Sequence, residues 1–154
     1  MTTTLTNTLN AEGINFSTVY TVYDQTAAVS ATNSPDNPGP PFTTGYRAIG
    51  SLGSQWIFIK AASAITINQA VGVDLTTGFG APLTKAFADA GRAIGAAPTA
   101  IGSGAYGWIQ LSGPVTVTLK NACLPDVPLY TSASAGMLDD TSASQTRIYG
   151  IRAR

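Results

Sequence analysis

The chain has 154 residues, enough for one domain with a sizeable core, and its formal net charge is zero, from 8 basic and 8 acidic residues. Only 10% of the residues are charged, well below the roughly 25% of an average protein. No basic stripe is present that would neutralise phosphates, which argues against nucleic-acid binding. A surface so poor in charge is either partly covered by other protein or coated with Thr, Ser and Asn.

The sequence carries no signal for a membrane or for export. No apolar run approaches the length of about 20 residues that a spanning helix needs, and the N-terminus lacks the basic patch and apolar core of a signal peptide. We therefore expect synthesis in a cytoplasm, without export, and no membrane partner. The single cysteine, Cys123, excludes an internal disulfide framework, and its apolar neighbours predict an inert buried thiol.

Residues 1–45 are predicted to form an N-terminal arm and a proline-rich spacer. Residues 1–13 are polar apart from Leu5 and Leu9, which is typical of an arm that is ordered only when a partner holds it. Residues 14–23 alternate in polarity and predict a strand, which can add to the edge of a neighbour's sheet. The four prolines within residues 35–41 exclude a helix and a central strand, and mark the boundary between arm and body.

The body, residues 46–154, shows an internal duplication into units 46–91 and 92–154. The tetrapeptide Arg-Ala-Ile-Gly at residues 47–50 recurs at residues 92–95, and each copy precedes a Trp-Ile run and an alternating apolar run. Chance similarity in a Gly- and Ala-rich chain is the alternative. Two units of short strands that share one core predict an all-β, barrel-like body, because closing a barrel removes exposed strand edges.

Within the body, residues 104–119 predict a β-hairpin, because two alternating runs are separated by Ser112-Gly113-Pro114. Residues 82–91 are the one helical candidate, with a loop as the equal alternative. The predicted core comprises the alternating aliphatic residues of both units: Ile57, Ile59, Ile65, Ile67, Val71, Val73, Ile109, Leu111, Val115, Val117, Val127 and Leu129.

Three aromatic residues, Trp56, Phe58 and Trp108, are predicted to project from the opposite faces of their strands. Either a second layer such as the arm covers them, or they lie at a contact between subunits. The residues predicted to contact another subunit or a partner protein are the large apolar residues of the arm and these three aromatics: Leu5, Leu9, Ile14, Phe16, Tyr20, Tyr23, Trp56, Phe58 and Trp108.

The sequence lacks the usual reactive groups, so we expect no catalytic, cofactor-binding or metal site, and no enzyme. The absence of histidine excludes His-based triads and His metal sites. Asp139 and Asp140 face opposite ways in a strand or are solvated in a loop, and no calcium-loop pattern surrounds them. The match of residues 102–107 to G-x-G-x-x-G precedes a strand and not a helix, which argues against a nucleotide.

The remaining charged residues are assigned to surface roles. Dispersed aspartates beside turn residues are predicted to cap turns, and isolated lysines are predicted to be solvated. These are Asp24, Asp36, Asp74, Asp89, Asp126, Lys60, Lys85 and Lys120.

The body resembles the small capsid decoration, or cement, proteins of tailed bacteriophages. The resemblance lies in residues 92–95, 107–113, 115–117 and 127–136, and covers the chain from about residue 47 to its end. It implies a β-rich subunit, usually a homotrimer, on the outer capsid surface of a virion, where it binds the major capsid protein and stabilises the head against packaged DNA. The alternative is a phage tail or spike module, or a glycan-binding module.

Overall fold

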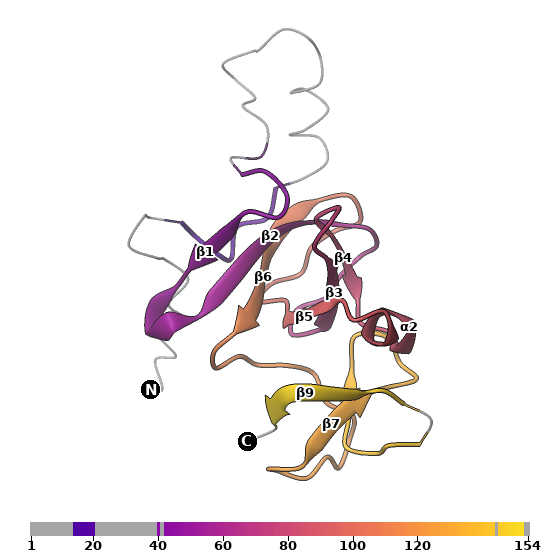
Figure 1. Cartoon of the computed structure of the whole chain (residues 1–154). Helices are drawn as coiled ribbons and strands as arrows, with labels where there is room; N and C mark the ends of the chain where they lie inside the picture. Colours follow the sequence, from indigo (N-terminus) through magenta and orange to yellow (C-terminus); the bar gives the residue numbers. More distant parts are fainter. Residues whose placement is uncertain (1–13, 21–39, 41, 144, 153–154) are drawn as a thin grey trace, which may run out of the picture.

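The structure of the chain is a computed structural model that describes residues 14–20, 40, 42–143 and 145–152 (Figure 1). Its elements are almost all β-strands, as predicted: β1 (Arg47–Ile49), β2 (Gln55–Ala61), β3 (Ala70–Asp74), β4 (Phe79–Pro82), β5 (Ala93–Ala96), β6 (Tyr106–Ser112), β7 (Pro128–Thr131), β8 (Leu138–Asp139) and β9 (Arg147–Arg152). A 3-10 turn, η1 (Ser51–Gly53), and a short helix, α2 (Lys85–Asp89), complete the described elements.

The main sheet closes on itself into a five-stranded barrel, which confirms the predicted barrel-like body. Its strands follow the order β2-β4-β3-β5-β6, and β6 pairs again with β2 to close the ring. The β2–β6 ladder is antiparallel and places Phe58 opposite Trp108 and Ile57 opposite Ile109. β1 pairs antiparallel with the first residues of β2, and β4 pairs parallel with the last residues of β2.

Strand alternation on β2 and β6 sorts the side chains between two cores. Ile57, Ile59 and Ile109 point into the barrel and are buried there with aliphatic residues of β3. Trp56, Phe58 and Trp108 point outward into a second, aromatic core. Because β2 is buried on both faces, its sequence is almost continuously apolar, as is usual for strands covered on both sides.

A second sheet, β8-β7-β9, packs against the outside of the barrel (Figure 1). Its buried residues Leu129, Leu138 and Ile148 form one cluster with Ala70 and Leu83 from the barrel side. The two sheets therefore share an apolar interface. The predicted duplication into units 46–91 and 92–154 stays a prediction, although its two tryptophan runs pair with one another as β2 and β6.

The predicted hairpin over residues 104–119 is wrong in its second half. Its first run forms β6, but residues 113–120 form no named strand. Both edges of β6 are already taken, by β2 and by β5. The Gln110 side-chain amide also donates hydrogen bonds to the carbonyls of Ser112 and Pro114, at 3.0 Å each, which fixes the chain as it leaves β6. The second run instead bonds to Asn68 and Leu138.

Most of the predicted core is buried, and three of the five exceptions lie in the failed hairpin. Ile67 and Val115 are exposed, and Leu111, Val117 and Val127 are only partly buried. Residues 82–91, left open between helix and loop, contain α2, which Thr84 caps by accepting a hydrogen bond from the backbone N–H of Phe87. The Gly-rich segment 102–107 runs directly into β6, as predicted.

Candidate contact surfaces and an acidic cluster

The outward side chains of β2 and β6 form an aromatic face, defined here as Trp56, Phe58, Tyr106 and Trp108. The four residues come from neighbouring strands whose registers place Phe58 directly opposite Trp108. The Trp108 ring meets the Phe58 ring edge to face at a centroid distance of 5.2 Å. Such pairs add to the burial of apolar area because the edge of one ring is attracted to the face of the other.

Residues 14–20, which we call the strap, cover this aromatic face. The Phe16 ring lies parallel to Trp56 at a centroid distance of 4.3 Å and meets Trp108 edge to face at 5.1 Å. Ile14 and Phe16 are both buried. Tyr20 exchanges two backbone hydrogen bonds with Tyr106, of 2.9 and 2.7 Å, and burial raises the pKa of the Tyr20 hydroxyl. The projecting aromatic residues were predicted to be covered by the arm or to lie at a contact between subunits, and in the structure residues of the arm cover them.

The residues that were predicted to contact a partner lie in different places. Trp56, Phe58 and Trp108 are buried under the strap, so within the described chain they offer no surface to a partner. Residues 14–20 are not a strand: they form a turn with isolated bridges, and the hydrogen bond from the Thr18 N–H to the carbonyl of Asn15 closes the turn that interrupts the extended backbone. The predicted contact residues Leu5, Leu9 and Tyr23 lie outside the described residues.

The two indole N–H groups of the aromatic face differ in their hydrogen bonding. Trp56 Nε1 donates a hydrogen bond to Ser54 Oγ at 3.0 Å. The Trp108 side chain is 0% exposed, and its Nε1 has no hydrogen-bond acceptor among the described residues. A buried donor without a partner destabilises the closed arrangement by the lost hydration of that group, about 1–3 kcal/mol. The aromatic face covered by the strap therefore retains the free-energy cost of one unpaired N–H group.

A second surface feature is the turn between β1 and β2, whose exposed apolar residues Ile49 and Leu52 we call the apolar tip. Leu52 is 91% exposed and Ile49 is 71% exposed. Leu52 also has a φ of 55°, in the left-handed region that a residue with a Cβ rarely adopts. Exposure and backbone strain thus coincide at one apolar side chain. Sequence reasoning missed this tip, because a single leucine in a turn carries no periodic signal.

A third feature is a cavity of about 340 Å³ between the barrel and β9, lined by Arg92, Ile94, Leu111 and residues 147–151, with Ala88 of α2. The Arg92 guanidinium forms an ion pair with Asp74 and holds the pKa of that carboxyl below its usual range. Arg147 lies over the ring of Tyr149, 5.1 Å from its centroid. Tyr149 is 80% exposed, so its ring is presented at the edge of the cavity.

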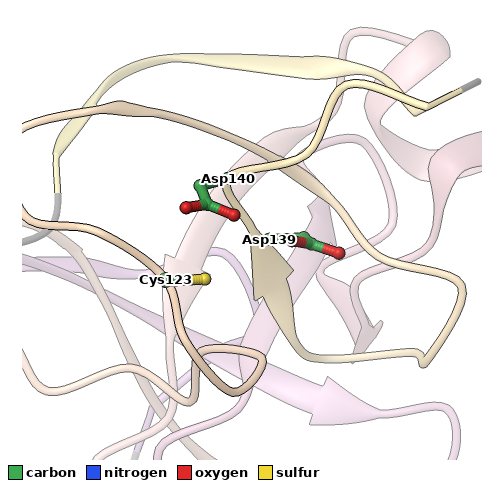
Figure 2. Close-up of side chains that lie close together, drawn as sticks. All are labelled: Cys123, Asp139 and Asp140. Carbon is green, nitrogen blue, oxygen red and sulfur yellow. The ribbon is translucent and has the colours of Figure 1, made fainter.

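The one grouping of potential metal ligands among the described residues is Cys123, Asp139 and Asp140, whose ligand atoms lie within 4.8 Å of one another (Figure 2). We call it the acidic cluster. The fold alone brings it together, because the loop of residues 120–124 lies beside the end of β8. Asp139 is buried and not solvated, which corrects one of the two alternatives for this residue, and Cys123 is only half-buried.

Hydrogen bonds within the acidic cluster indicate a structural role. Lys120 Nζ donates to Asp139 Oδ2 at 3.0 Å, and this ammonium holds the pKa of the Asp139 carboxyl below its usual value. The backbone N–H of Leu124 donates to Asp140 Oδ2 at 3.0 Å. Because the carboxylates already bind a cation and a backbone donor of the loop, the cluster fastens residues 120–124 to β8. The absence of a metal site stays a prediction.

The other charged residues partly match their predicted roles. Asp74 caps a turn, since its carboxylate accepts hydrogen bonds from the backbone of Thr76 and Thr77. The predicted isolation of Lys85 and Lys120 is wrong, because each forms an ion pair with an aspartate. Lys60 lies over the rings of Phe79 and Tyr106. Asp24 and Asp36 lie outside the described residues.

No helix in the described ranges is long and apolar enough to cross a membrane. Comparison of the chain with known protein families, curated proteins and solved structures finds no match.

Proposed function

We propose that this protein is a structural protein of a tailed-bacteriophage head, which binds the outer capsid surface and holds neighbouring major-capsid subunits together. Its partners under this proposal are the major capsid protein and further copies of the chain, as a homotrimer. The proposal starts from the sequence resemblance of the body to capsid decoration proteins. A rigid, closed barrel that presents contact residues at its margins is compatible with a protein whose task is adhesion.

The observation that carries the proposal is the apolar tip. A fully exposed leucine loses the hydrophobic gain of burial, about 1.5–3 kcal/mol, and the left-handed backbone of Leu52 adds a further cost. Both costs fall on a residue at the projecting turn of a hairpin (Figure 1). A strained residue that no described part of the chain covers supports a role in contact with a partner, where burial of the side chain offsets the strain.

The test uses heads of the encoding phage from which the protein has been stripped. The wild-type chain is added over a range of concentrations, and the amount that sediments with the heads is measured. We expect saturable binding, and a loss of affinity on the order of tenfold or more for Leu52→Asn, because each 1.4 kcal/mol corresponds to a factor of ten. Ile67→Ser, which alters another exposed apolar residue, is the matched control.

The possible outcomes distinguish a failure of the proposed function from a failure of the proposed role of Leu52. A wild-type chain that does not sediment with its own phage's heads contradicts the proposed function. Wild-type binding that Leu52→Asn leaves unchanged contradicts only the role of the apolar tip. Removal of residues 1–40 is expected to weaken decoration as well, since three arms on one trimer act at high effective concentration.

The alternative function, glycan binding by a tail or spike module, is favoured by one observation. The buried Trp56 and Trp108 cannot stack on a sugar, but the exposed ring of Tyr149 borders the cavity near β9. Aromatic rings and arginines at the rim of a cavity suit the apolar faces and hydroxyls of a glycan. A glycan-array signal that Tyr149→Ala abolishes, while Tyr46→Ala retains it, supports this alternative over the adhesive role.

A further inference from the structure

The strap contacts the body at the aromatic face and, through Val19, at the core of the barrel. Its buried side chains, Ile14 and Phe16, contact the aromatic face, and its backbone pairs with β6 at Tyr20. Within the strap, the Thr18 N–H donates a hydrogen bond to the carbonyl of Asn15 at 3.2 Å, and the Ser17 N–H donates one to Asn15 Oδ1 at 2.9 Å. The strap therefore docks as a short peptide does, with the apolar anchors Ile14 and Phe16, a partly buried Val19 and a two-bond backbone bridge at one end.

The aromatic face is built on β2 and β6, two paired strands of the barrel wall. Phe58 and Trp108 lie opposite each other in the β2–β6 ladder, which also lines the barrel core. Phe42, which follows the spacer, meets Trp108 edge to face at 5.0 Å and Phe58 at 5.5 Å. The face is thus a preformed site for an aromatic side chain beside an extended backbone.

Under the strap, Trp108 Nε1 is buried without an acceptor among the described residues. Departure of the strap would remove the Phe16 ring from this indole, and any hydration that the donor gains would offset part of the loss of contacts. Exchange of the strap between two copies costs little at equilibrium, because each copy regains the contacts that it gives up.

The covalent connection allows the strap to reach another copy. The strap ends at Tyr20 and the described body resumes at residue 40. The intervening residues 21–39 span at most about 65 Å when fully extended, which exceeds the width of a small domain. The connection therefore imposes no requirement that a strap lie on its own body.

We propose that the aromatic face is a docking site for the strap of a second copy of this chain, so that neighbouring copies exchange residues 14–20. A strap on its own body competes at a millimolar effective concentration, so exchange grows as copies are brought close together. The inference concerns two copies alone and does not depend on the proposed binding to a capsid.

The test uses full-length chains in which Cys123→Ser removes the native thiol. One chain carries Tyr20→Cys and a second, tagged chain carries Tyr106→Cys. These residues are directly opposite in an antiparallel bridge, a separation at which a disulfide forms. After the two chains are mixed and mildly oxidised, we expect a disulfide-linked heterodimer on a non-reducing gel, in an amount that rises with protein concentration.

Four controls make the result specific. Phe16→Ala in the Tyr20→Cys chain is expected to reduce the heterodimer several-fold, whereas Ser17→Ala, which changes an exposed neighbour, leaves it unchanged. Replacement of the partner cysteine by one at the exposed Thr116 should give no heterodimer. An unlabelled peptide of residues 14–20, added in excess, should lower the yield.

Both remaining outcomes overturn the proposal. A single chain with Tyr20→Cys and Tyr106→Cys must form the bond internally at low concentration, because otherwise the strap does not sit on the aromatic face. If this intramolecular bond forms but no heterodimer forms even at millimolar concentration, the strap is confined to its own body and no exchange occurs.

Discussion

At the scale of single residues, several backbone contacts in the barrel leave no room for a side chain. A Cβ on Gly95 would lie 2.5 Å from the backbone oxygen of Gln110 and 2.6 Å from Ile109 Cγ2. Gly95 sits in β5, where this strand approaches β6 and completes the ring. The glycine therefore permits the closest approach that barrel closure requires.

Replacement of Gly95 by alanine is expected to destabilise the protein by about 1–3 kcal/mol or more, because the backbone of Gln110 cannot move away without opening the β5–β6 contact. Gly102→Ala is the matched control, because its Cβ would have only Ala105 Cβ nearby, at 4.0 Å. Urea unfolding followed by circular dichroism measures both. Equal unfolding free energies for the two variants would contradict the role of Gly95 in closure.

Substitution of Leu52 is expected to stabilise the protein, in contrast to Gly95→Ala. Asparagine tolerates the left-handed conformation better than leucine, so Leu52→Asn is expected to raise the free energy of unfolding by about 0.5–1 kcal/mol. Ile49→Asn, at an exposed neighbour with an ordinary backbone, should give no gain. The measurement is again urea unfolding. A destabilised Leu52→Asn would mean that the leucine makes contacts within its own chain, and would weaken the adhesive role of the apolar tip.

At the scale of elements, the acidic cluster links the loop of residues 120–124 to the second sheet. Lys120 lowers the pKa of Asp139 below the usual 3.8, so the carboxylate stabilises the fold above that pH. This stability is lost as the pH falls through the lowered pKa, when the carboxyl takes up a proton. Asp74 and Asp89, which pair with Arg92 and Lys85, act in the same direction.

Lys120→Met is expected to lower the thermal midpoint above pH 5, and the difference from the wild type should shrink as the pH approaches 3. Comparison with the wild type separates Asp139 from the other aspartates, whose partners are unchanged. Lys60→Met is the control, because Lys60 forms no ion pair among the described residues. A constant difference between pH 3 and pH 7 would show that Lys120 does not act through the ionised carboxylate of Asp139.

The elements that the sequence predicted well are those whose pattern is local. β2 and β6 alternate strongly, so their two faces and most of the barrel core were predictable from residues such as Ile57 and Ile109. The partner of a strand is not a local property. The run from Val115 alternates as clearly as β6, yet it pairs elsewhere because β2 and β5 occupy both edges of β6.

The same distinction holds for the candidate contact surfaces. The outward direction of Trp56, Phe58 and Trp108 followed from alternation, whereas their cover by Phe16 depends on how the arm folds back, which periodicity does not encode. The acidic cluster joins Cys123 to Asp139, whose proximity depends on the placing of a loop. The exposure of Leu52 depends on a turn geometry that many sequences adopt.

At the scale of the whole molecule, the barrel combines strands from both predicted units. β2, β3 and β4 come from residues 46–91, and β5 and β6 from residues 92–154. The second sheet adds a cluster that joins Leu129, Leu138 and Ile148 to the outside of the barrel. Neither unit has a complete core alone, so the two are expected to fold as one cooperative body.

Separate expression of fragments 46–91 and 92–154 is therefore expected to give unfolded chains, while the full chain melts in a single transition. Circular dichroism and calorimetry measure this, with agreement between calorimetric and van't Hoff enthalpies as the criterion for the full chain. A cooperative melt from either fragment alone would show that one unit is an independent domain, and would favour a fusion of two preformed modules.

The arrangement of β2 has a mechanical consequence. The strand begins beside β1 at the projecting turn, ends beside β4 in the barrel wall, and runs along β6 for its whole length. A pull on the turn along this axis would load the β2–β6 hydrogen bonds in shear, so that they share the force and do not open one after another. Whatever holds the turn would thus be tethered to the longest ladder of the barrel.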